Sequence, residues 1–442
     1  MRTLLLFLMP FLLAAQNPPL SVHDLIGKVE QSRERRSVER LASFGTRHSL
    51  SEAGSETRGI GAASRWLGEE ADALTRLPGS RLVAFEDRFT AEPGPRIPKP
   101  VEMVNIGVLL PGMDLSRSNE ALVVLAHYDS RASDVMDANS DAPGAVDDAS
   151  GVAMAFEMAQ VMAAEQLAIN IYFVAVAGEE QGQIGSAHLA KRLKAEGIHV
   201  LGAISMDIVG NVIGSNGIKD SSTVRLFSEG VPAGETEAQK RVREELGSEN
   251  DGASRELARY IKRVGEKYVE GLECLVMLRR DRVGRGGDHF SFNKEGIPAI
   301  RVTDTWENYD RQHQNPRSVG SRAYGDSPSF FEPGYAVKIT RVLMAAVRQL
   351  ALAPEPPSNV TLGGAASADA KLTWTLETDP RIKGVVVYRR RADAVQWQQT
   401  ENFGRVESAV LRGAGTDNFF YAVATVDAAG NESLAVSPTR ID

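Results

Sequence analysis

Four short runs of apolar residues, rich in β-branched side chains, stand out along the chain. Continuous apolar runs of this length are typical of strands that are buried on both faces of a parallel sheet. The predicted strands are residues 121–126, 169–177, 200–206 and 297–302. Around them, apolar residues recur at helical spacing, which predicts helices at residues 37–43, 61–68, 150–162, 186–195 and 335–352. Ser150 is expected to cap the third of these helices. The alternation favours an α/β fold, with a mostly parallel mixed sheet and helices on both faces.

A different architecture is expected near the end of the chain. Residues 354–358, Pro-Glu-Pro-Pro-Ser, have the composition of a linker. Short strands separated by turns follow and contain Trp374, Tyr388 and Tyr421, a pattern that predicts a C-terminal β-sandwich over residues 354–442. With these aromatic residues, the segment resembles a fibronectin type III domain.

Length and composition set the expected limits of the main domain. A chain of 442 residues has room for about two or three domains. The α/β domain is predicted at residues 16–353, with an exposed insertion at about 228–254, where the composition becomes polar and charged. Residues 1–15 combine one basic residue, a short apolar stretch and small residues, which is typical of a signal peptide. This stretch is shorter than the roughly 20 apolar residues of a membrane span, so we expect a secreted or periplasmic protein with no membrane span.

Charge and cysteine content narrow the classes of partner and environment. The 58 acidic residues outnumber the 50 basic ones, giving a net charge of −8, which argues against a nucleic-acid partner. Cys274 is the single cysteine, so no intramolecular disulfide is possible. It lies in an apolar segment and is expected to be a buried, unreactive side chain.

Imidazole and carboxylate side chains follow the predicted strands directly. His127 and Asp129 are two residues apart on a strand end, so they can share one face, and Asp129 can orient the imidazole. Glu179 and Glu180 are neighbours and should diverge, so that one can bind a metal while the other faces a substrate.

Two further carboxylates belong to the same edge of the sheet. Asp147 lies in a loop just before a predicted helix, and Asp207 closes the third predicted strand. Because ligands bind beyond the carboxyl ends of parallel strands, these groups should converge on one crevice. A histidine and several carboxylates gathered there would cost desolvation free energy unless a cation compensated them. A metal site is the leading hypothesis.

The order of these motifs is informative. His-x-Asp at 127–129, Asp-Asp-Ala-Ser-Gly at 147–151, Gly-Glu-Glu at 178–180 and Met-Asp-x-x-Gly-Asn at 206–211 follow one another. This series resembles the di-zinc exopeptidase family of bacterial leucyl aminopeptidases, which also contains glutaminyl cyclases and glutamate carboxypeptidases. The resemblance extends from about residue 41 to 352 and excludes the C-terminal domain.

The resemblance implies a bound pair of Zn²⁺ ions and assigns a role to each motif residue. It makes Glu179 the general base and Asp147 the carboxylate that bridges the metals. For the last histidine ligand it favours His313, whereas His289 matches a segment that lies near the site without binding metal. The implied ligand set is His127, Asp147, Glu180, Asp207 and His313.

The function implied is that of a secreted zinc-dependent aminopeptidase acting on peptides with a free N-terminus. A glutaminyl cyclase and a carboxypeptidase are alternatives on the same fold, the latter requiring an arginine clamp for a terminal carboxylate, for which arginines at 279–285 are available. A catalytically inactive binding protein is the alternative from another class. The C-terminal domain is expected to be dispensable for activity, and it is a candidate surface for protein or cell-surface partners.

Overall fold

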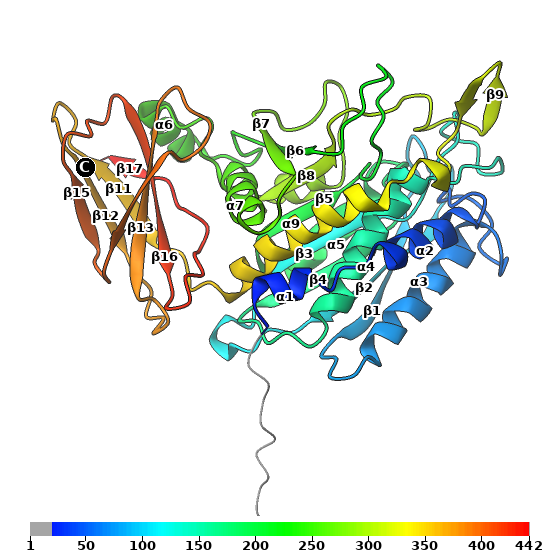
Figure 1. The fold of residues 1–442 in the computed structure, drawn as a ribbon, viewed down its shortest axis with the longest axis horizontal. Coiled ribbons are helices and arrows are strands. Elements are labelled where there is room, and N and C mark those ends of the chain that lie inside the picture. The colour runs from blue at the N-terminus through cyan, green and yellow to red at the C-terminus, as the bar shows by residue number, and fades with distance from the viewer. Residues whose placement is uncertain (1–19, 442) are drawn as a thin grey trace, which may run out of the picture.

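The structure, a computed structural model, describes residues 20–441, so the predicted signal peptide lies outside the described residues. It contains a large α/β domain and a smaller β domain at the C-terminal end (Figure 1). Within the described residues, no helix has both the length and the apolar character needed to cross a bilayer.

The large domain is built on an eight-stranded sheet with the order β1-β2-β4-β3-β5-β8-β6-β7 (Figure 1). The strands are β1 Val83–Ala91, β2 Val101–Leu110, β3 Glu120–His127, β4 Asn170–Val176, β5 His199–Met206, β6 Thr223–Ser228, β7 Glu273–Met277 and β8 Ala299–Asp304. The four central strands, β4, β3, β5 and β8, are mutually parallel. They are the four strands predicted from the apolar runs, and the mixed, mostly parallel α/β fold is confirmed.

The outer strands were not predicted because their sequences do not form continuous apolar runs. In β1 the charged side chains Glu86, Asp87 and Arg88 interrupt the apolar residues. Strands β1 and β2 pair antiparallel, β2 joins β4 antiparallel, and β6 joins β8 antiparallel. These outer strands widen the sheet on both sides. The carboxyl ends of the four central parallel strands stay at one edge of the sheet.

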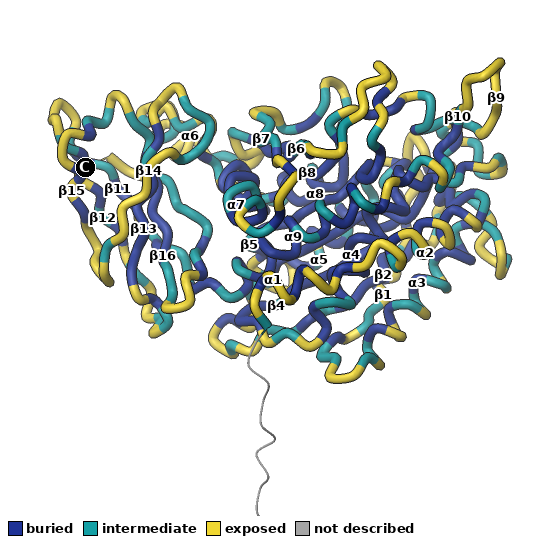
Figure 2. The backbone as a smooth tube through the Cα atoms, viewed as in Figure 1, coloured by how far each residue is buried: buried dark blue, intermediate teal, exposed yellow. Residues whose placement is uncertain are grey.

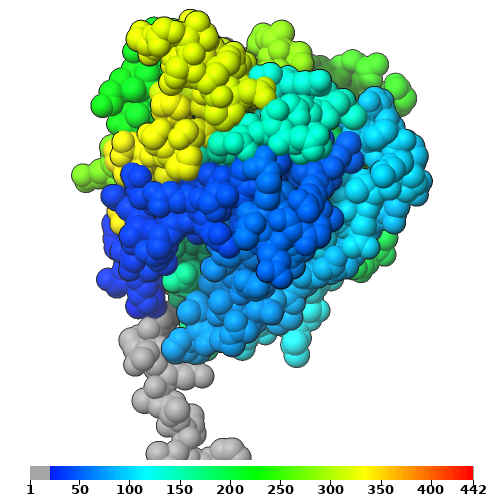
Figure 3. Space-filling model, turned by 90° about the vertical axis from the view of Figure 1, so that its right-hand side faces the viewer, coloured from blue at the N-terminus to red at the C-terminus, as the bar shows by residue number. Residues whose placement is uncertain are grey.

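Helices cover both faces of the sheet, and the buried chain concentrates between them (Figure 2). On one face lie α1 Val22–Ile26, α2 Gln31–Ala42, α3 Gly59–Thr75, α4 Ser150–Met162, α7 Ala253–Tyr268 and α9 Pro333–Leu352. On the other lie α5 Ile184–Ala195 and α8 His289–Lys294. The N-terminal helices form much of the outer surface seen in Figure 3. Helix α6, Glu237–Leu246, has no buried residue and belongs to the polar stretch predicted as an insertion.

The predicted capping role of Ser150 is wrong. Its hydroxyl donates a hydrogen bond to the carbonyl of Val146, 2.7 Å away. The N-terminus of α4 is instead capped by Asp148, whose carboxylate accepts from the backbone N–H of Gly151 at 3.1 Å. The turn before α4 places Asp148 inside the domain, where its side chain is fully buried and reaches the first turn of the helix.

The C-terminal domain consists of two sheets, with the strand orders β15-β12-β11-β17 and β14-β13-β16. The strands are β11 Ser358–Gly363, β12 Ala370–Thr375, β13 Gly384–Arg391, β14 Gln399–Phe403, β15 Ser408–Leu411, β16 Phe419–Val426 and β17 Arg440–Ile441. Trp374 and Tyr421 are buried in the core between the sheets, as the aromatic pattern predicted. The sequence therefore predicted a β domain at the correct place.

The two domains share a buried, charged interface along α7. Arg390 of the β domain reaches Asp251 at 2.6 Å, and Arg259 of α7 reaches the same carboxylate at 3.0 Å. The indole N–H of Trp397 donates to Glu256 at 2.8 Å. Through these buried or half-buried groups the β domain packs against α7, although residues 354–358 have the composition of a linker.

The interface generates a stability prediction. Arg390→Ala should lower the free energy of unfolding by about 3 kcal/mol, because it leaves the buried Asp251 with one fewer cationic partner. Arg391→Ala is the matched control: its side chain is exposed and pairs with the exposed Asp393, so stability should change little. Urea unfolding of the full chain would measure both, and equal effects would contradict a structural role for the interface.

Candidate metal centre

The site lies where the chain leaves the central strands. Strand β3 is flanked by β4 on one side and β5 on the other, so successive crossovers diverge from it. Such a switch point leaves a crevice at the carboxyl ends of the strands. His127 is the last residue of β3, and Asp207 directly follows β5.

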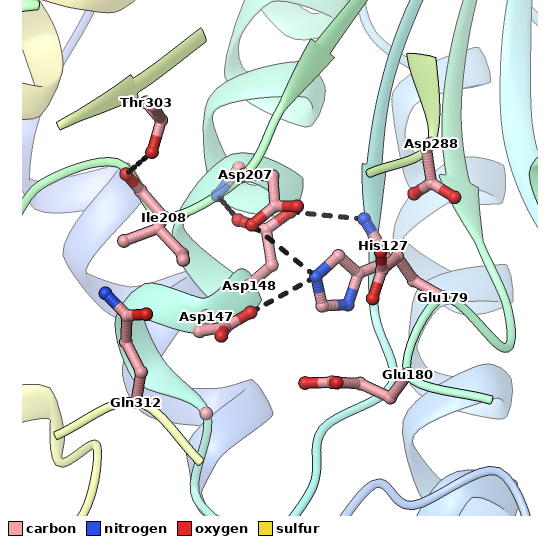
Figure 4. A network of polar contacts seen from close by, with 12 residues as sticks. His127, Asp147, Asp148, Glu179, Glu180, Asp207, Ile208, Asp288, Thr303 and Gln312 are labelled. Carbon is pink, nitrogen blue, oxygen red and sulfur yellow. Dashed lines mark hydrogen bonds and ion pairs between the residues drawn. The ribbon is translucent and has the colours of Figure 1, made fainter. Parts of the chain in front are cut away.

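A first group of possible metal ligands consists of His127, Asp147 and Asp207. Figure 4 shows both carboxylates directed at the same edge of the imidazole ring. Nε2 of His127 lies 3.2 Å from an Asp147 oxygen and 3.9 Å from an Asp207 oxygen. One atom from each residue lies within 4.8 Å of the others, and all three residues are buried.

A second group consists of Asp147, Glu180 and His313. Nε2 of His313 lies 3.1 Å from Oδ2 of Asp147 and 3.1 Å from Oε1 of Glu180. The contact between Asp147 and His127 uses the other oxygen, Oδ1. The two oxygens of Asp147 are thus divided between the groups, the arrangement expected of a carboxylate that bridges two cations.

The loop after β4 carries Glu179 and Glu180 in different directions (Figure 4). Gly178 begins this loop with φ +69°, and a Cβ there would come within 2.9 Å of the Met103 sulfur. Glu180 belongs to the second group, whereas Glu179 borders the adjoining cavity. The sequence expectation that the neighbours diverge describes this geometry.

Asp129 acts on the site differently from the expectation. Its carboxylate accepts hydrogen bonds from the backbone N–H groups of Glu179 and Glu180, both at 3.1 Å. The nearest carboxylate oxygen is 3.6 Å from Nδ1 of His127, too far for a hydrogen bond. The backbone carbonyl of Asp129 lies 3.1 Å from that nitrogen. Asp129 therefore orients the imidazole through its main chain and fixes the glutamate loop through its side chain.

His313 reaches the site from a loop held by contacts with distant segments. Asn315 and Ser133 exchange two hydrogen bonds of 3.0 Å, and Arg311 donates to the side chain of Asn211. His313 itself has φ +53° and a side chain 30% exposed.

His289 lies elsewhere. It is fully buried, and its Nε2 is 3.0 Å from the carbonyl of Arg280. Burial lowers its pKa to about 4, so the ring is neutral near pH 7. Neither group of possible ligands within residues 20–441 includes it.

Burial and close pairing set the charge states of the metal-free site. Burial alone would lower the pKa of His313, but Glu180 and Asp147 raise it to about 10. The pKa of His127 is likewise raised, by the surrounding carboxylates in spite of burial. Burial would raise the pKa of Asp147, yet the two imidazoles hold it well below the usual value. Burial dominates at Glu179 and raises its pKa well above the usual range.

Three supporting residues were missed in the sequence. Asp326 accepts from the backbone N–H of Val146 and Asp147 at 2.8 and 2.7 Å, which fixes the turn that carries the shared carboxylate. Asp304 accepts from the N–H of Gly210 at 2.9 Å and steadies the loop after β5. Arg301, on β8, lies 2.7 Å from an Asp207 oxygen. The only sequence signal for a role of Arg301 was its charge within an otherwise apolar strand. No sequence signal pointed to Asp326.

The residues fit a pair of borderline cations such as Zn²⁺. Imidazole nitrogens and carboxylate oxygens are ordinary zinc donors. Among residues 20–441, the buried Oε1 of Glu180 has Nε2 of His313 3.1 Å away but no well-aligned hydrogen-bond donor, which suits an oxygen that could bind a cation. Beside the two groups lies a cavity of about 470 Å³, lined by residues that include Glu179, Glu180 and Asp207.

The choice between the two histidines can be tested by metal content. His313→Ala should lower the zinc bound per chain, because it removes a nitrogen donor from the second group and leaves it with two carboxylates. His289→Ala should keep the zinc content, since its ring contacts the Arg280 carbonyl. Metal analysis of the folded variants would decide; metal loss only in His289→Ala would overturn the placement.

Metal binding should depend on pH with a definite sign. Because His313 has a pKa of about 10 in the metal-free protein, its ring is protonated at pH 7, and a cation must displace that proton. Affinity should therefore rise between pH 6 and 8 by about tenfold per pH unit for each displaced proton. Calorimetry in two buffers of different ionisation enthalpy measures the release, and a zero value at pH 7 would contradict it.

Comparison with known proteins agrees with this geometry. Residues 105–323, a segment that contains all the candidate ligands, match the Peptidase family M28. A probable zinc metalloprotease of Leptosphaeria maculans is 36% identical over 422 residues, covering 95% of this chain and 97% of that protein. A second, from Pyricularia oryzae, is 37% identical over 433 residues, covering 96% and 86%.

A solved structure supports the fold. The LapA aminopeptidase of Legionella pneumophila superimposes with a TM-score of 0.53 over 76% of this chain and 75% of that chain, at 19% identity. The similarity in sequence to these two metalloproteases extends along nearly the whole chain. The chain therefore belongs to peptidase family M28 and is a zinc metallopeptidase.

Proposed function

We propose that this metallopeptidase is an aminopeptidase that binds two Zn²⁺ ions and removes N-terminal residues from peptides. The observation that carries the proposal is the shared Asp147 carboxylate, which joins two groups of ligands beside a cavity that Glu179 borders. His127, Asp147 and Asp207 would hold one ion, and Asp147, Glu180 and His313 the other. When bound, such ions supply Lewis-acid chemistry, polarising a carbonyl and lowering the pKa of water.

Glu179 has the properties of a general base. Its carboxylate is outside both ligand groups, and within residues 20–441 it has no hydrogen bond or ion pair that would tie it down. It takes the proton of the water that attacks the scissile carbonyl and delivers it to the leaving nitrogen as the C–N bond breaks. In the metal-free protein burial raises its pKa, and bound cations beside it would oppose this shift by favouring the ionised carboxylate that a base requires.

Asp129 positions this base. By accepting from the N–H groups of Glu179 and Glu180, its carboxylate sets the course of the backbone from which both side chains project. The position of Glu179 relative to the second ligand group is thereby fixed. This is a positioning role, because the Asp129 carboxylate is buried and does not line the cavity.

Two other functions are less well supported. A glutaminyl cyclase uses one zinc ion and no attacking water, and it does not require a carboxylate divided between two ligand groups. An inactive binding protein would have lost metal ligands or the base. Here the five candidate ligands and Glu179 all lie at one site. Export to the periplasm or the exterior is a further part of the proposal, supported by the sequence of residues 1–15.

The proposal is tested with three peptides that share one core sequence. They carry a free N-terminal amine, an acetylated amine and an N-terminal glutamine. An aminopeptidase should cleave the first and spare the second, with activity lost to a chelator and restored by zinc. Cyclisation of the glutamine peptide with one zinc per chain would assign the cyclase function, and cleavage of the acetylated peptide would exclude an aminopeptidase.

Substitution of the two adjacent glutamates should separate their roles. Glu179→Gln should keep the metal and the fold but lower kcat by about 10²–10⁴-fold, the usual effect of removing a positioned general base. Glu180→Gln, the same chemical change one residue along the chain, should lose metal. Metal analysis beside steady-state kinetics gives both readouts. Full metal content in both variants, with only Glu180→Gln inactive, would reverse the assignment.

A further inference from the structure

The cavity beside the metal centre has an unusual charge composition for a peptidase that recognises a free amine. Its lining includes Arg96, Arg131, Arg282, Arg285 and Arg301. The acidic residues in the same lining are Asp147, Glu179, Glu180 and Asp207. Three of these four carboxylates are candidate metal ligands. With two divalent cations bound, the arginines would be left in excess, and the cavity would carry a positive potential.

A single buried carboxylate organises one side of this cavity. Glu307 is within 2.9 Å of both Arg282 and Arg285, and within 2.7 Å of Arg225. Burial would raise the pKa of Glu307, but the surrounding guanidinium groups hold it below the usual value, so it stays ionised. Glu307 thus holds three arginines in fixed positions. Asp281 pairs with one of them, Arg282, at 3.0 Å, so two carboxylates face three guanidinium groups.

Arg282 and Arg285 differ in their exposure and in the number of protein groups that they contact. Arg282 is 9% exposed and bonds to Asp281, to Glu307 and to the carbonyl of Gly286. Arg285 is 32% exposed, and its contacts are Glu307 at 2.9 Å and a long bond to Gln312 at 3.4 Å. Arg285 therefore presents part of a preordered guanidinium group to the cavity.

Arg301 extends the positive lining toward the metal ligands. Its side chain is 1% exposed, and it pairs with Asp207 at 2.7 Å. Its other partners include the carbonyl of Gly286 at 2.8 Å and a carboxylate oxygen of Asp281 at 3.6 Å. The charge of Arg301 is therefore largely compensated by the protein, which leaves Arg285 as the guanidinium available to a ligand. The cavity therefore combines an exposed arginine at Arg285 with a buried one at Arg301.

We propose that this cavity binds a carboxylate of the substrate and makes the enzyme selective for acidic peptides. The inference rests on the proposed peptidase function. Guanidinium groups match carboxylates in bidentate geometry, and in a peptide the available anions are carboxylates. The carboxylate belongs either to an N-terminal Asp or Glu side chain or to the C-terminus of a short peptide. Arg285 is the specificity-determining residue, because it is preordered, partly exposed and lines the cavity.

Three dipeptides separate the two sources of the carboxylate. Leu-Ala amide carries none, Glu-Ala amide carries a side-chain carboxylate, and Leu-Ala with a free C-terminus carries a terminal one. The zinc-loaded full chain should cleave one of the acidic peptides with a kcat/KM at least about tenfold above that of Leu-Ala amide, the value of one charge-assisted contact. The preferred acidic peptide identifies the source. Equal values for all three would overturn the proposal.

Substitutions of arginine residues then test whether Arg285 determines the specificity for acidic peptides. Arg285→Gln should lower kcat/KM for the preferred acidic peptide by about 10–100-fold and that for Leu-Ala amide by less than about threefold. Arg285→Lys should recover part of the loss, since lysine keeps the positive charge but lacks the planar guanidinium that binds a carboxylate through two N–H groups. Arg279→Gln, in the same segment but exposed and outside the cavity lining, is the matched control and should behave as wild type. An equal loss for acidic and neutral peptides in Arg285→Gln would overturn the role.

A binding measurement keeps this inference distinct from the proposed function. Calorimetric titration with glutarate should show weaker binding, by about tenfold or more, to zinc-loaded Arg285→Gln than to wild type or Arg279→Gln. If no peptide is cleaved but this difference remains, the aminopeptidase function fails and the carboxylate site stands. If peptides are cleaved and glutarate binds all three proteins equally, the carboxylate site fails and the peptidase function stands.

Discussion

The site depends on one carboxylate, that of Asp147, whose two oxygens face different imidazoles. In the metal-free protein these contacts pair a buried carboxylate with two imidazoles whose pKa values are raised. A pair of cations would replace the two protons without requiring the side chains to move far. The two groups of possible ligands thus meet at Asp147, and the neighbouring segments keep Asp147 at that position.

The supporting residues act mostly through backbone amides. Asp326 holds the Asp147 turn, Asp129 holds the glutamate loop and Asp304 holds the loop after β5. Each is a buried carboxylate that accepts two or more N–H groups, which keeps a loop rigid where no regular ladder can. Arg301 adds a charged contact to this set, since it pairs with the carboxylate of Asp207 at 2.7 Å.

The central sheet could be predicted because β3, β4, β5 and β8 are buried on both faces and so have continuous apolar sequences. Edge strands such as β1 could not, because charged residues are tolerated where one face meets water. For the site, the strand ends placed His127, Glu180 and Asp207 near one another, and the family resemblance supplied the rest. The position of His313 depends on contacts with Ser133 and Asn211, far away in the chain, and no local pattern encodes such contacts. The supporting role of Asp326 was invisible for the same reason.

The double acceptance by Asp129 couples two duties on one short loop. Because a single carboxylate accepts from the amides of both Glu179 and Glu180, the positions of the two side chains are linked, and a displacement of one is also a displacement of the other. A substitution at Asp129 would free both glutamates at once, whereas an exchange of either glutamate side chain would leave the two hydrogen bonds in place, because the donors are main-chain N–H groups.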